Sequence, residues 1–227
     1  AAPTPALYAK RPRPADVVAR ADARDVDRCV LVGHDRGALV AFRAALDHPD
    51  RVSHLGILDV VPTLDTWGVL HGVDAAVAFH LYLMAQPPGL PETMIRNSAD
   101  AFFGSFLDAW TQDPAAIPAD VRAHYLASSR DAVDSIVADY RATATVDVEH
   151  DQASLEAGDR LAMPVAVVQQ EWGAQLASDA AGGGRRGARG PRPPAGRRRR
   201  RPTPAGHTRA EEAPGDVAAL VRSLARR

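Results

Sequence analysis

A short apolar run that ends in a tight glycine turn constrains this chain more than any other feature. Cys29-Val30-Leu31-Val32 is typical of a strand buried on both faces, and Gly33-His34-Asp35-Arg36-Gly37 follows it directly. A helical stretch from Ala38 to Leu46 then stops before Pro49, and the apolar run from Leu55 to Val61 predicts a second buried strand. Strand, turn, helix and strand form a βαβ unit, so the expected fold class is α/β, a parallel sheet with helices on both faces.

The remaining segments predict how the chain is organised around that unit. Residues 1–64 should form part of the sheet core, and residues 65–150, which are rich in alanine and amphipathic segments, should form a helical lid inserted into it. Residues 151–180 should return to the core through a third strand, Met163 to Val168. Residues 205–227 should carry a histidine loop and a final helix with a one-sided apolar stripe.

Residues 181–204 differ in composition from everything else in the chain. Residues 181–201 hold nine of the 27 basic residues and no acidic one, which leaves the remainder with a net charge of -10. This stretch has no apolar side chain larger than alanine or proline, which predicts disorder. Lys10 is the single lysine beside 26 arginines, a bias typical of GC-rich coding regions, in which a shifted reading frame yields mainly Gly, Ala, Arg and Pro. We therefore hypothesise a local frameshift, with a genuine basic arm that binds nucleic acid as the alternative.

Composition and motifs exclude several classes of function. No apolar stretch reaches the roughly 18 to 20 residues that span a bilayer, and the N-terminus lacks the apolar core of a signal peptide, so we expect a cytoplasmic protein with no membrane partner. The acidic body gives no reason to expect nucleic acid as its partner. The eight histidines show no metal-ligand spacing, and Gly182-Gly183-Gly184 lacks the strand, Lys and Ser/Thr of a phosphate loop. We therefore expect neither a metal nor a cofactor.

The glycine turn predicts a nucleophile elbow with aspartate where serine usually stands. Both flanking glycines, Gly33 and Gly37, are expected because side chains there would collide with the neighbouring strand and helix. Exposed N–H groups at the helix N-terminus should keep Asp35 ionised. A carboxylate that attacks carbon forms an ester that water can cleave, whereas a serine would form a stable ether, so the motif favours displacement of halide or opening of an epoxide. The alternative is that Asp35 only caps the helix.

Hydrolysis of such an ester needs a base that activates water and an acidic residue that orients the base. His207 precedes the final helix, and Asp59 ends the second strand, so both can reach the carboxyl edge of the sheet, where ligands of such folds bind. Glu171, after the third strand, is the alternative orienter. The competing interpretations are a surface histidine and an aspartate that caps a turn.

Several motifs, in the same order along the chain, resemble the haloacetate and fluoroacetate dehalogenases of the α/β-hydrolase superfamily, which are similar to epoxide hydrolases. The resemblance covers residues 15–180 and 205–225. It implies an α/β-hydrolase fold with a helical lid, and hydrolysis of the carbon–halogen bond of a small halo-acid through an aspartyl ester. The motifs are G-H-D-R-G-A (33–38), A-L-D-H-P-D-R-V (45–52), L-D-V-V-P-T-L-D-T-W (58–67), L-M-A-Q-P (83–87), D-Y-R-A (139–142), E-H-D (149–151) and G-H-x-x-x-E-E-A-P (206–214).

The resemblance also implies a role for each site residue. Asp35 would be the nucleophile, His207 the base that activates water, and Asp59 the acidic partner of that base. The partners implied are a small halo-acid and water, no cofactor is required, and a homodimer is left open.

Substrate contacts would come from Arg36, which would grip the substrate carboxylate, and from His80 and Tyr140 in the lid, which would hydrogen-bond the departing halide. Leu39 stands where the fluoroacetate enzymes carry a second carboxylate-binding arginine, and Leu81 where they carry a halide-pocket tryptophan. These two departures predict a more apolar pocket. Other halo-acids, neutral haloalkanes and epoxides therefore stay open as substrates.

Two alternatives concern the chain as a whole. An epoxide hydrolase would use paired lid tyrosines, and Tyr82 with Tyr140 is the pair that the sequence offers. In the superfamily the nucleophile follows several strands and a His-Gly loop that supplies an oxyanion donor, so the resemblance implies an N-terminally truncated chain. An inactive fragment with a basic nucleic-acid-binding segment is then the second alternative.

Overall fold

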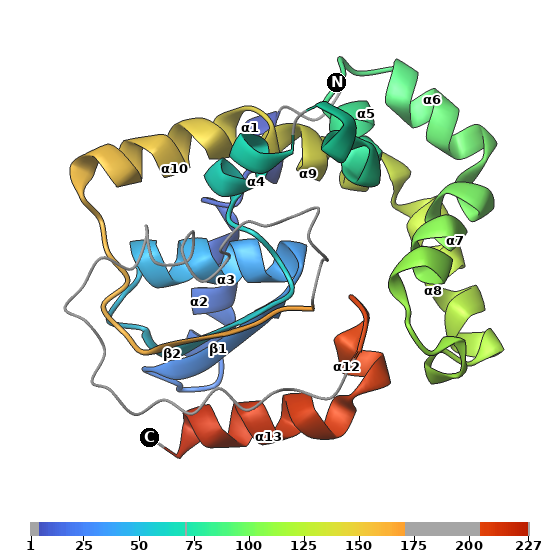
Figure 1. Ribbon diagram of the computed structural model, residues 1–227. Coiled ribbons are helices and arrows are strands. Elements are labelled where there is room, and N and C mark those ends of the chain that lie inside the picture. The colour runs from blue at the N-terminus through green and yellow to red at the C-terminus, as the bar shows by residue number, and fades with distance from the viewer. Residues whose placement is uncertain (1–4, 71, 171–204, 227) are drawn as a thin grey trace.

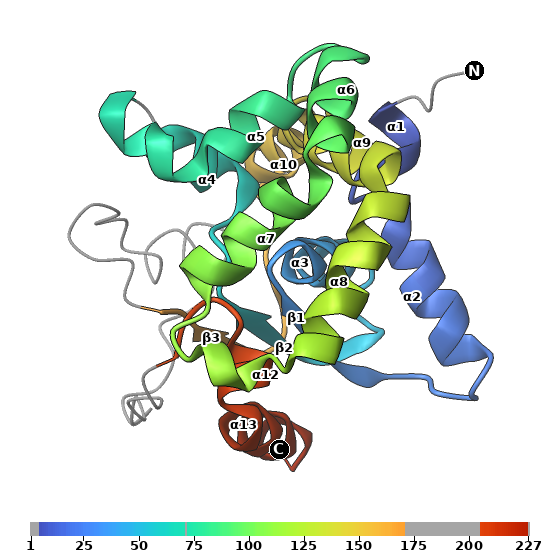
Figure 2. The ribbon, with the colours of Figure 1, turned by 90° about the vertical axis from the view of Figure 1, so that its right-hand side faces the viewer.

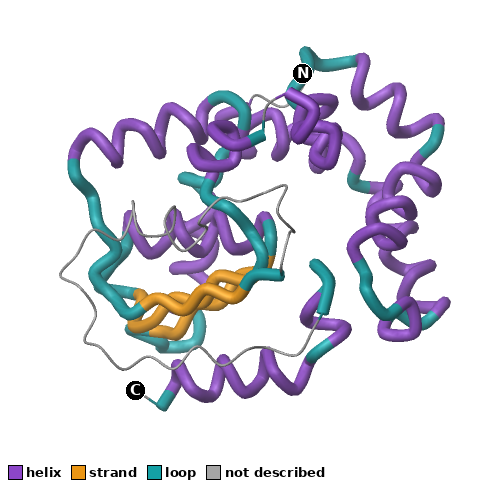
Figure 3. Tube along the Cα trace, viewed as in Figure 1, coloured by secondary structure: helices purple, strands orange, loops and turns teal. Residues whose placement is uncertain are grey.

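The computed structural model describes residues 5–70, 72–170 and 205–226 (Figure 1). Its centre is a sheet of three parallel strands in the order β1 (Cys29–His34), β2 (Val52–Leu58) and β3 (Val165–Val168). Leu31 pairs with Leu55, which pairs in turn with Val165. In space, the three strands lie at the centre of the described part of the molecule, with helices around them (Figure 3). The predicted α/β fold class is thereby confirmed.

Helices cover both faces of this sheet. On one face lies α3 (Arg36–Asp47), with α2 (Arg13–Asp22) beside it, and α13 (Pro214–Ala225) lies on the other (Figures 1 and 2). The face of α3 that meets the sheet is rich in alanines, whose small side chains let the helix approach closely. These alanines form one apolar core with side chains of β2 and of the segment before β3: Ala38, Ala41, Ala45, Val52, Leu55, Ile57, Leu161 and Met163.

The first strand is less buried than its sequence predicts. The apolar run was expected to be buried on both faces, but every residue of β1 is only half-buried, whereas β2 is buried along most of its length. The reason is the order of the strands: within the described residues β1 lies at an edge of the sheet and β2 in its centre. Local hydrophobicity indicates a strand but does not fix its place in the sheet.

A helical insertion, residues 63–157, connects β2 to β3 and packs around its own apolar centre of Met84, Ile95, Val133 and Val137. It extends slightly beyond the predicted 65–150, and its action as a lid stays a prediction. In Figure 1 it forms an arc over one side of the sheet. Its helices are α4 (Thr63–Val69), a 3-10 helix (Gly72–Ala78), α5 (Phe79–Met84), α6 (Leu90–Asn97), α7 (Ala99–Trp110), a 3-10 turn (Pro114–Ala116), α8 (Ala119–Asp131), α9 (Val133–Thr143) and α10 (Val146–Ala157).

The two ends of the described chain add short helices. Before α2 lies α1 (Pro5–Tyr8), and α12 (Arg209–Glu212) precedes the expected final helix, α13. No helix among the described ranges is both long and apolar enough to cross a membrane. Residues 181–204, for which the sequence predicts disorder or a shifted reading frame, lie outside the described residues, as does the rival orienter Glu171.

The turn between β1 and α3 needs only one of its two glycines. A Cβ on Gly33 would lie 2.4 Å from the carbonyl oxygen of Gly37 and 2.5 Å from the Cα of Ala38, so no side chain fits there. A Cβ on Gly37 would meet no described atom within 4 Å, because this residue lies exposed in the first turn of α3. The steric expectation is therefore confirmed for Gly33 and wrong for Gly37.

We expect Gly33→Ala to lower the free energy of unfolding by about 3 kcal/mol, because the added methyl group collides with backbone that cannot move aside. Gly37→Ala is the matched control, and it should raise the free energy of unfolding by up to about 1 kcal/mol, since alanine is favoured over glycine in a helix. Chemical denaturation of both variants measures the difference. Equal stabilities would contradict the packing described for Gly33.

Candidate active site

Two aspartates stand at the carboxyl ends of neighbouring strands. Asp35 follows β1 and donates its N–H to the carbonyl of Leu58 at 3.0 Å, and Asp59 follows β2 and donates to Val168 at 2.8 Å. Both backbones are left-handed, with φ of 47° and 48°, a region that residues other than glycine rarely adopt. Strained backbone of this kind clusters at functional sites. The sheet ladder thus carries both carboxyl groups to the same edge.

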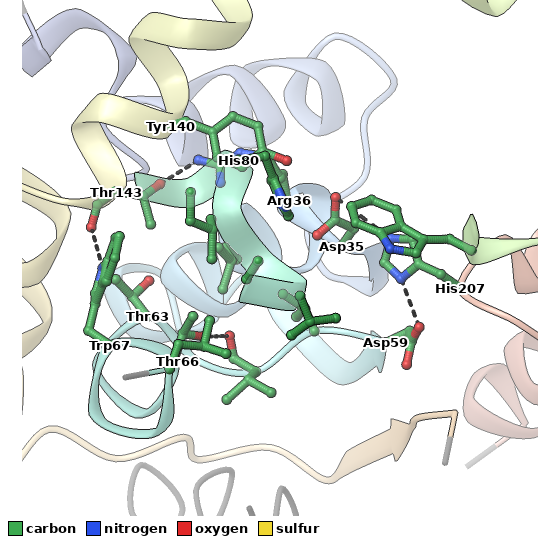
Figure 4. Close-up of a pocket in the computed structure, with 18 residues that line it drawn as sticks. Asp35, Arg36, Asp59, Thr63, Thr66, Trp67, His80, Tyr140, Thr143 and His207 are labelled. Carbon is green, nitrogen blue, oxygen red and sulfur yellow. Dashed lines mark hydrogen bonds and ion pairs between the residues drawn. The ribbon is translucent and has the colours of Figure 1, made fainter. Parts of the chain in front are cut away.

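His207 lies between these two carboxylates (Figure 4). Its Nδ1 is 2.7 Å from Oδ2 of Asp59, and its Nε2 is 3.9 Å from Oδ2 of Asp35. Asp59 is 1% exposed, and its second oxygen accepts the N–H of Gln170 at 2.9 Å. The structure therefore brings the three predicted catalytic residues together. The capping alternative for Asp35 is wrong, because its side chain makes no cap hydrogen bond to α3.

Burial and charge act in opposite directions on the pKa values of this group. Burial alone would lower the pKa of His207, but the neighbouring carboxylates of Asp35 and Asp59 outweigh it and raise the pKa to about 9. Burial alone would raise the pKa of Asp35, but His207, Arg36 and His34 lower it. At neutral pH the resting site therefore holds an imidazolium beside an ionised nucleophile.

His34, the residue before Asp35 in the elbow, contacts His207. His34 Nε2 lies 2.8 Å from the carbonyl oxygen of His207, and the two ring centroids are 4.6 Å apart. Burial and the charge of His207 lower the pKa of His34, so it is neutral at neutral pH and can donate to that carbonyl. The residue before the nucleophile thus helps to hold the loop that carries the base.

The loop of His207 is also joined to the end of α7 in the helical insertion. The N–H of His207 donates to the carbonyl of Trp110 at 2.8 Å, and a Cβ on Gly206 would lie 2.2 Å from that same oxygen. Glu212 completes the junction, since its carboxylate accepts four hydrogen bonds from both sides. The donors are the N–H groups of Gly206, Gln112 and Asp113 and the hydroxyl of Thr208, at 2.8 to 3.0 Å.

A cavity of about 910 Å³, including its open mouth, lies above these residues and is lined by all six predicted site residues. His80 is 7% exposed, and its Nδ1 has no hydrogen-bond partner among the described atoms. Burial lowers the pKa of His80 to about 4, and it raises the pKa of Tyr140 above its usual range. Both side chains are therefore neutral at neutral pH and can donate hydrogen bonds into the cavity.

Arg36 makes contacts with the helical insertion that the sequence did not predict. Its Nε donates to Oδ2 of Asp139, and its Nη2 donates to the carbonyl of Asp139 at 2.9 Å and to the hydroxyl of Thr143. Its Cζ lies 3.8 Å from the ring centroid of Tyr140. Nε and Nη2 therefore both contact residues of α9. Arg36 also lines the cavity, and its grip on a substrate carboxylate stays a prediction.

Several residues of the site were not singled out from the sequence. Trp110 lines the cavity, and its ring centroid lies 5.3 Å from that of His80 and 5.0 Å from that of His207. An indole is therefore present in the site, although Leu81 stands where one was expected. Trp67 lines the cavity too. Asp139 is the first residue of the D-Y-R-A motif (139–142), which is the one feature of the sequence that points to it.

Two other observations bear on the alternatives. Tyr82 turns its hydroxyl to the carbonyl of Leu70 and does not line the cavity, so the tyrosine pair expected of an epoxide hydrolase is not assembled. Within the described ranges no cluster of three or more His, Cys, Asp or Glu side chains is arranged to hold a metal ion.

Comparison with known proteins gives three informative relatives, and no protein-family model matches the chain. A fluoroacetate dehalogenase of a Burkholderia species is 36% identical over 132 residues, which are 57% of this chain and 43% of the relative, so the chain spans less than half of that protein. A candidate epoxide hydrolase structure from Pseudomonas aeruginosa is 31% identical, with a TM-score of 0.82 over 96% of this chain and 72% of that one. A candidate α/β hydrolase from Nostoc is 29% identical, with a TM-score of 0.84 over 99% and 76%.

We expect Glu212→Gln to lower the free energy of unfolding by about 1 to 3 kcal/mol, because an amide cannot accept from all four donors. Burial would raise the pKa of Glu212, but its hydrogen bonds lower it below the ordinary 4.5. The difference from wild type is therefore full above that value and disappears as the pH falls through the lowered pKa. Denaturant titrations at several pH values measure it. Glu211→Gln is the control, and an equal loss in both variants would contradict the junction described for Glu212.

Proposed function

Because the chain belongs to the α/β-hydrolase superfamily, as its 31% identity over most of the Pseudomonas protein shows, we propose that it breaks the carbon–halogen bond of a small organic halide. The substrate is either a halo-acid, as in the fluoroacetate dehalogenase that resembles this chain, or an uncharged analogue. The observation that carries this proposal is an aspartate, rather than a serine, at the strand–helix elbow and within reach of a buried His–Asp pair. Water is the second substrate.

In the first step an oxygen of Asp35 attacks the carbon that bears the halogen. A carbon–oxygen bond forms, the carbon–halogen bond breaks, and the halide leaves with the bonding electrons, so Asp35 becomes a neutral alkyl ester. His80 and Tyr140, both neutral donors in the cavity lining, stabilise the charge that develops on the halide. The lowered pKa of Asp35 keeps the nucleophile ionised for this attack.

Ester formation prepares the base for the second step. The negative charge of Asp35 is one of the two that raise the pKa of His207, and the ester removes it. His207 then releases its proton to solvent and can accept one from a water molecule that attacks the ester carbonyl carbon. Asp59 stabilises the imidazolium formed in this way. The alcohol product leaves with the original oxygen of Asp35, and Asp35 retains an oxygen from water.

An epoxide hydrolase is the second candidate, because an aspartyl ester also forms when an epoxide ring is opened. The arrangement of the insertion favours the halide, since Tyr82 donates to a backbone carbonyl while His80 faces the cavity with Tyr140. Ring opening would need a proton for the departing oxygen, and only one tyrosine lines the cavity in the part of the chain described.

The oxygen source tests this mechanism. In a single turnover of chloroacetate or chloroacetamide in heavy-oxygen water, we expect the first product to carry light oxygen, with label entering Asp35 and appearing in later product. Asp35→Asn should release no halide, and His207→Gln should release one equivalent and then hold an ester that mass spectrometry detects. Heavy oxygen in the first product would show direct attack by water and refute the ester.

The proposed change in the base can be measured without substrate. Asp35→Asn removes the same charge that ester formation removes, so the pKa of His207 should fall from about 9 toward its ordinary 6.5. Asp147→Asn, at a buried carboxylate held by Lys10, is the control and should leave that pKa unchanged. Nuclear magnetic resonance titration of the imidazole measures both. A His207 pKa that stays near 9 in Asp35→Asn would contradict the coupling.

A further inference from the structure

The cavity extends beyond the reacting groups toward α4. In Figure 4, His207 lies on the right and Trp67 and Thr66 on the left, and other lining side chains lie between them. Leu70, which follows α4 directly, lines the cavity as well. We call this part the α4 end of the cavity, and it consists of Thr63, Thr66, Trp67 and Leu70. A ligand bound at the nucleophile therefore has further cavity beside it on the side of α4.

The polar side chains of the α4 end are occupied by hydrogen bonds within the protein. The hydroxyl of Thr66 donates to two preceding backbone carbonyls at 3.0 and 3.1 Å, and the hydroxyl of Thr63 donates to Asp151. The indole Nε1 of Trp67 donates to the carbonyl of Thr143 at 3.3 Å. A polar group of a ligand would find no free donor among these side chains, so its removal from water would be unfavourable. A hydrocarbon group loses no hydrogen bond there.

The reacting end of the cavity has the opposite character. Asp35 and the imidazolium of His207 carry charge, Arg36 lines the cavity, and Nδ1 of His80 has no hydrogen-bond partner among the described atoms. A few polar groups at one end and an apolar wall at the other are typical of small-molecule sites, in which the polar groups fix the orientation of the ligand. The lining therefore separates a polar part of the ligand from an apolar part.

Trp67 is held in one orientation by the start of the helical insertion. Besides the hydrogen bond of its Nε1, its ring lies edge to face with that of Tyr82, at a centroid distance of 5.4 Å. The hydroxyl of Tyr82 donates in turn to the carbonyl of Leu70, which joins α5 to the end of α4. The apolar surface is therefore formed before a ligand arrives, and little conformational entropy is lost when a hydrocarbon group binds to it.

From this arrangement we propose that the α4 end binds a hydrocarbon group of the substrate, an alkyl chain or an aromatic ring attached to the carbon that bears the halogen. Thr66 and Trp67 are then specificity-determining residues, which select organic halides larger than the haloacetates. The inference rests on the proposed function for the reaction and narrows its substrate by size, for halo-acids and uncharged halides alike.

Binding of unreactive analogues tests this subsite without turnover. The 227-residue chain is titrated at neutral pH with acetate, butyrate and hexanoate, and with the matching amides, so that the result does not depend on the head group. Nuclear magnetic resonance follows the indole N–H of Trp67, which the Trp67→Phe variant assigns. We expect the affinity to rise about threefold for each added methylene, because each is buried against apolar side chains. The terminal methyl of hexanoate should also show a nuclear Overhauser contact to the ring protons of Trp67.

A variant that fills the subsite should remove this gain. Thr66→Phe should lower the ratio of hexanoate affinity to acetate affinity about tenfold, because the added ring occupies the space of the alkyl chain. Gly68→Leu is the matched control, since it adds bulk to α4 at an exposed residue outside the cavity lining, where a Cβ would meet no described atom within 4 Å. It should leave the ratio within twofold of wild type. If Thr66→Phe does not fold, the Overhauser contact in wild type decides.

Three results would overturn the subsite: equal affinities for acetate and hexanoate in wild type, an equal fall of the ratio in Thr66→Phe and Gly68→Leu, or a hexanoate methyl without contact to Trp67. Halide release separates the subsite from the reaction. The compounds 2-bromohexanoate and 2-bromopropionate react at the same kind of carbon, and kcat/KM should favour the longer one. A rise in affinity with chain length but no halide release from either compound would support the subsite and count against the proposed reaction.

Discussion

Carboxylates withdrawn from water need cations or N–H donors beside them, and the site is organised around this requirement. Asp59 meets it through His207, and Asp139 meets it through Lys10 and Arg36. His207 and Arg36 both line the cavity, and Lys10 binds the same carboxylate as Arg36. Charges that would destabilise the fold if left alone therefore orient the groups on which recognition and reaction depend.

The local part of this architecture could be predicted from the sequence because short-range sterics decide it. The apolar run, the need for glycine at Gly33 and the helix that follows all depend on neighbours a few residues apart, and the structure confirms each of them. The burial of β1 could not be predicted, since it depends on which strands lie beside it. The prediction for Gly37 failed for a different reason. The motif suggested that a side chain there would collide with its neighbours, but Gly37 is exposed and a side chain would meet none of them.

The meeting of Asp35, Asp59 and His207 follows from general rules of parallel sheets, whose carboxyl ends share one edge. The orientation of Arg36 follows from no such rule. It depends on Asp139, which is 103 residues later in the chain, and on Lys10, which approaches from a different element. One sequence gives no means of deciding which of its 28 acidic residues will face a given arginine. The sequence thus predicts that Arg36 belongs to the site, but it does not predict which residues surround Arg36.

The junction at Glu212 bears on how such proteins can be recombined. Helical insertions look exchangeable, because they leave and rejoin the sheet at two points, but the end of α7 is tied through Glu212 to the loop that carries His207. A chimera that grafts residues 63–157 onto another core would therefore import half of an interface whose other half lies at 206–212. The exchangeable unit of this fold is discontinuous in sequence, and it consists of the insertion together with the histidine loop.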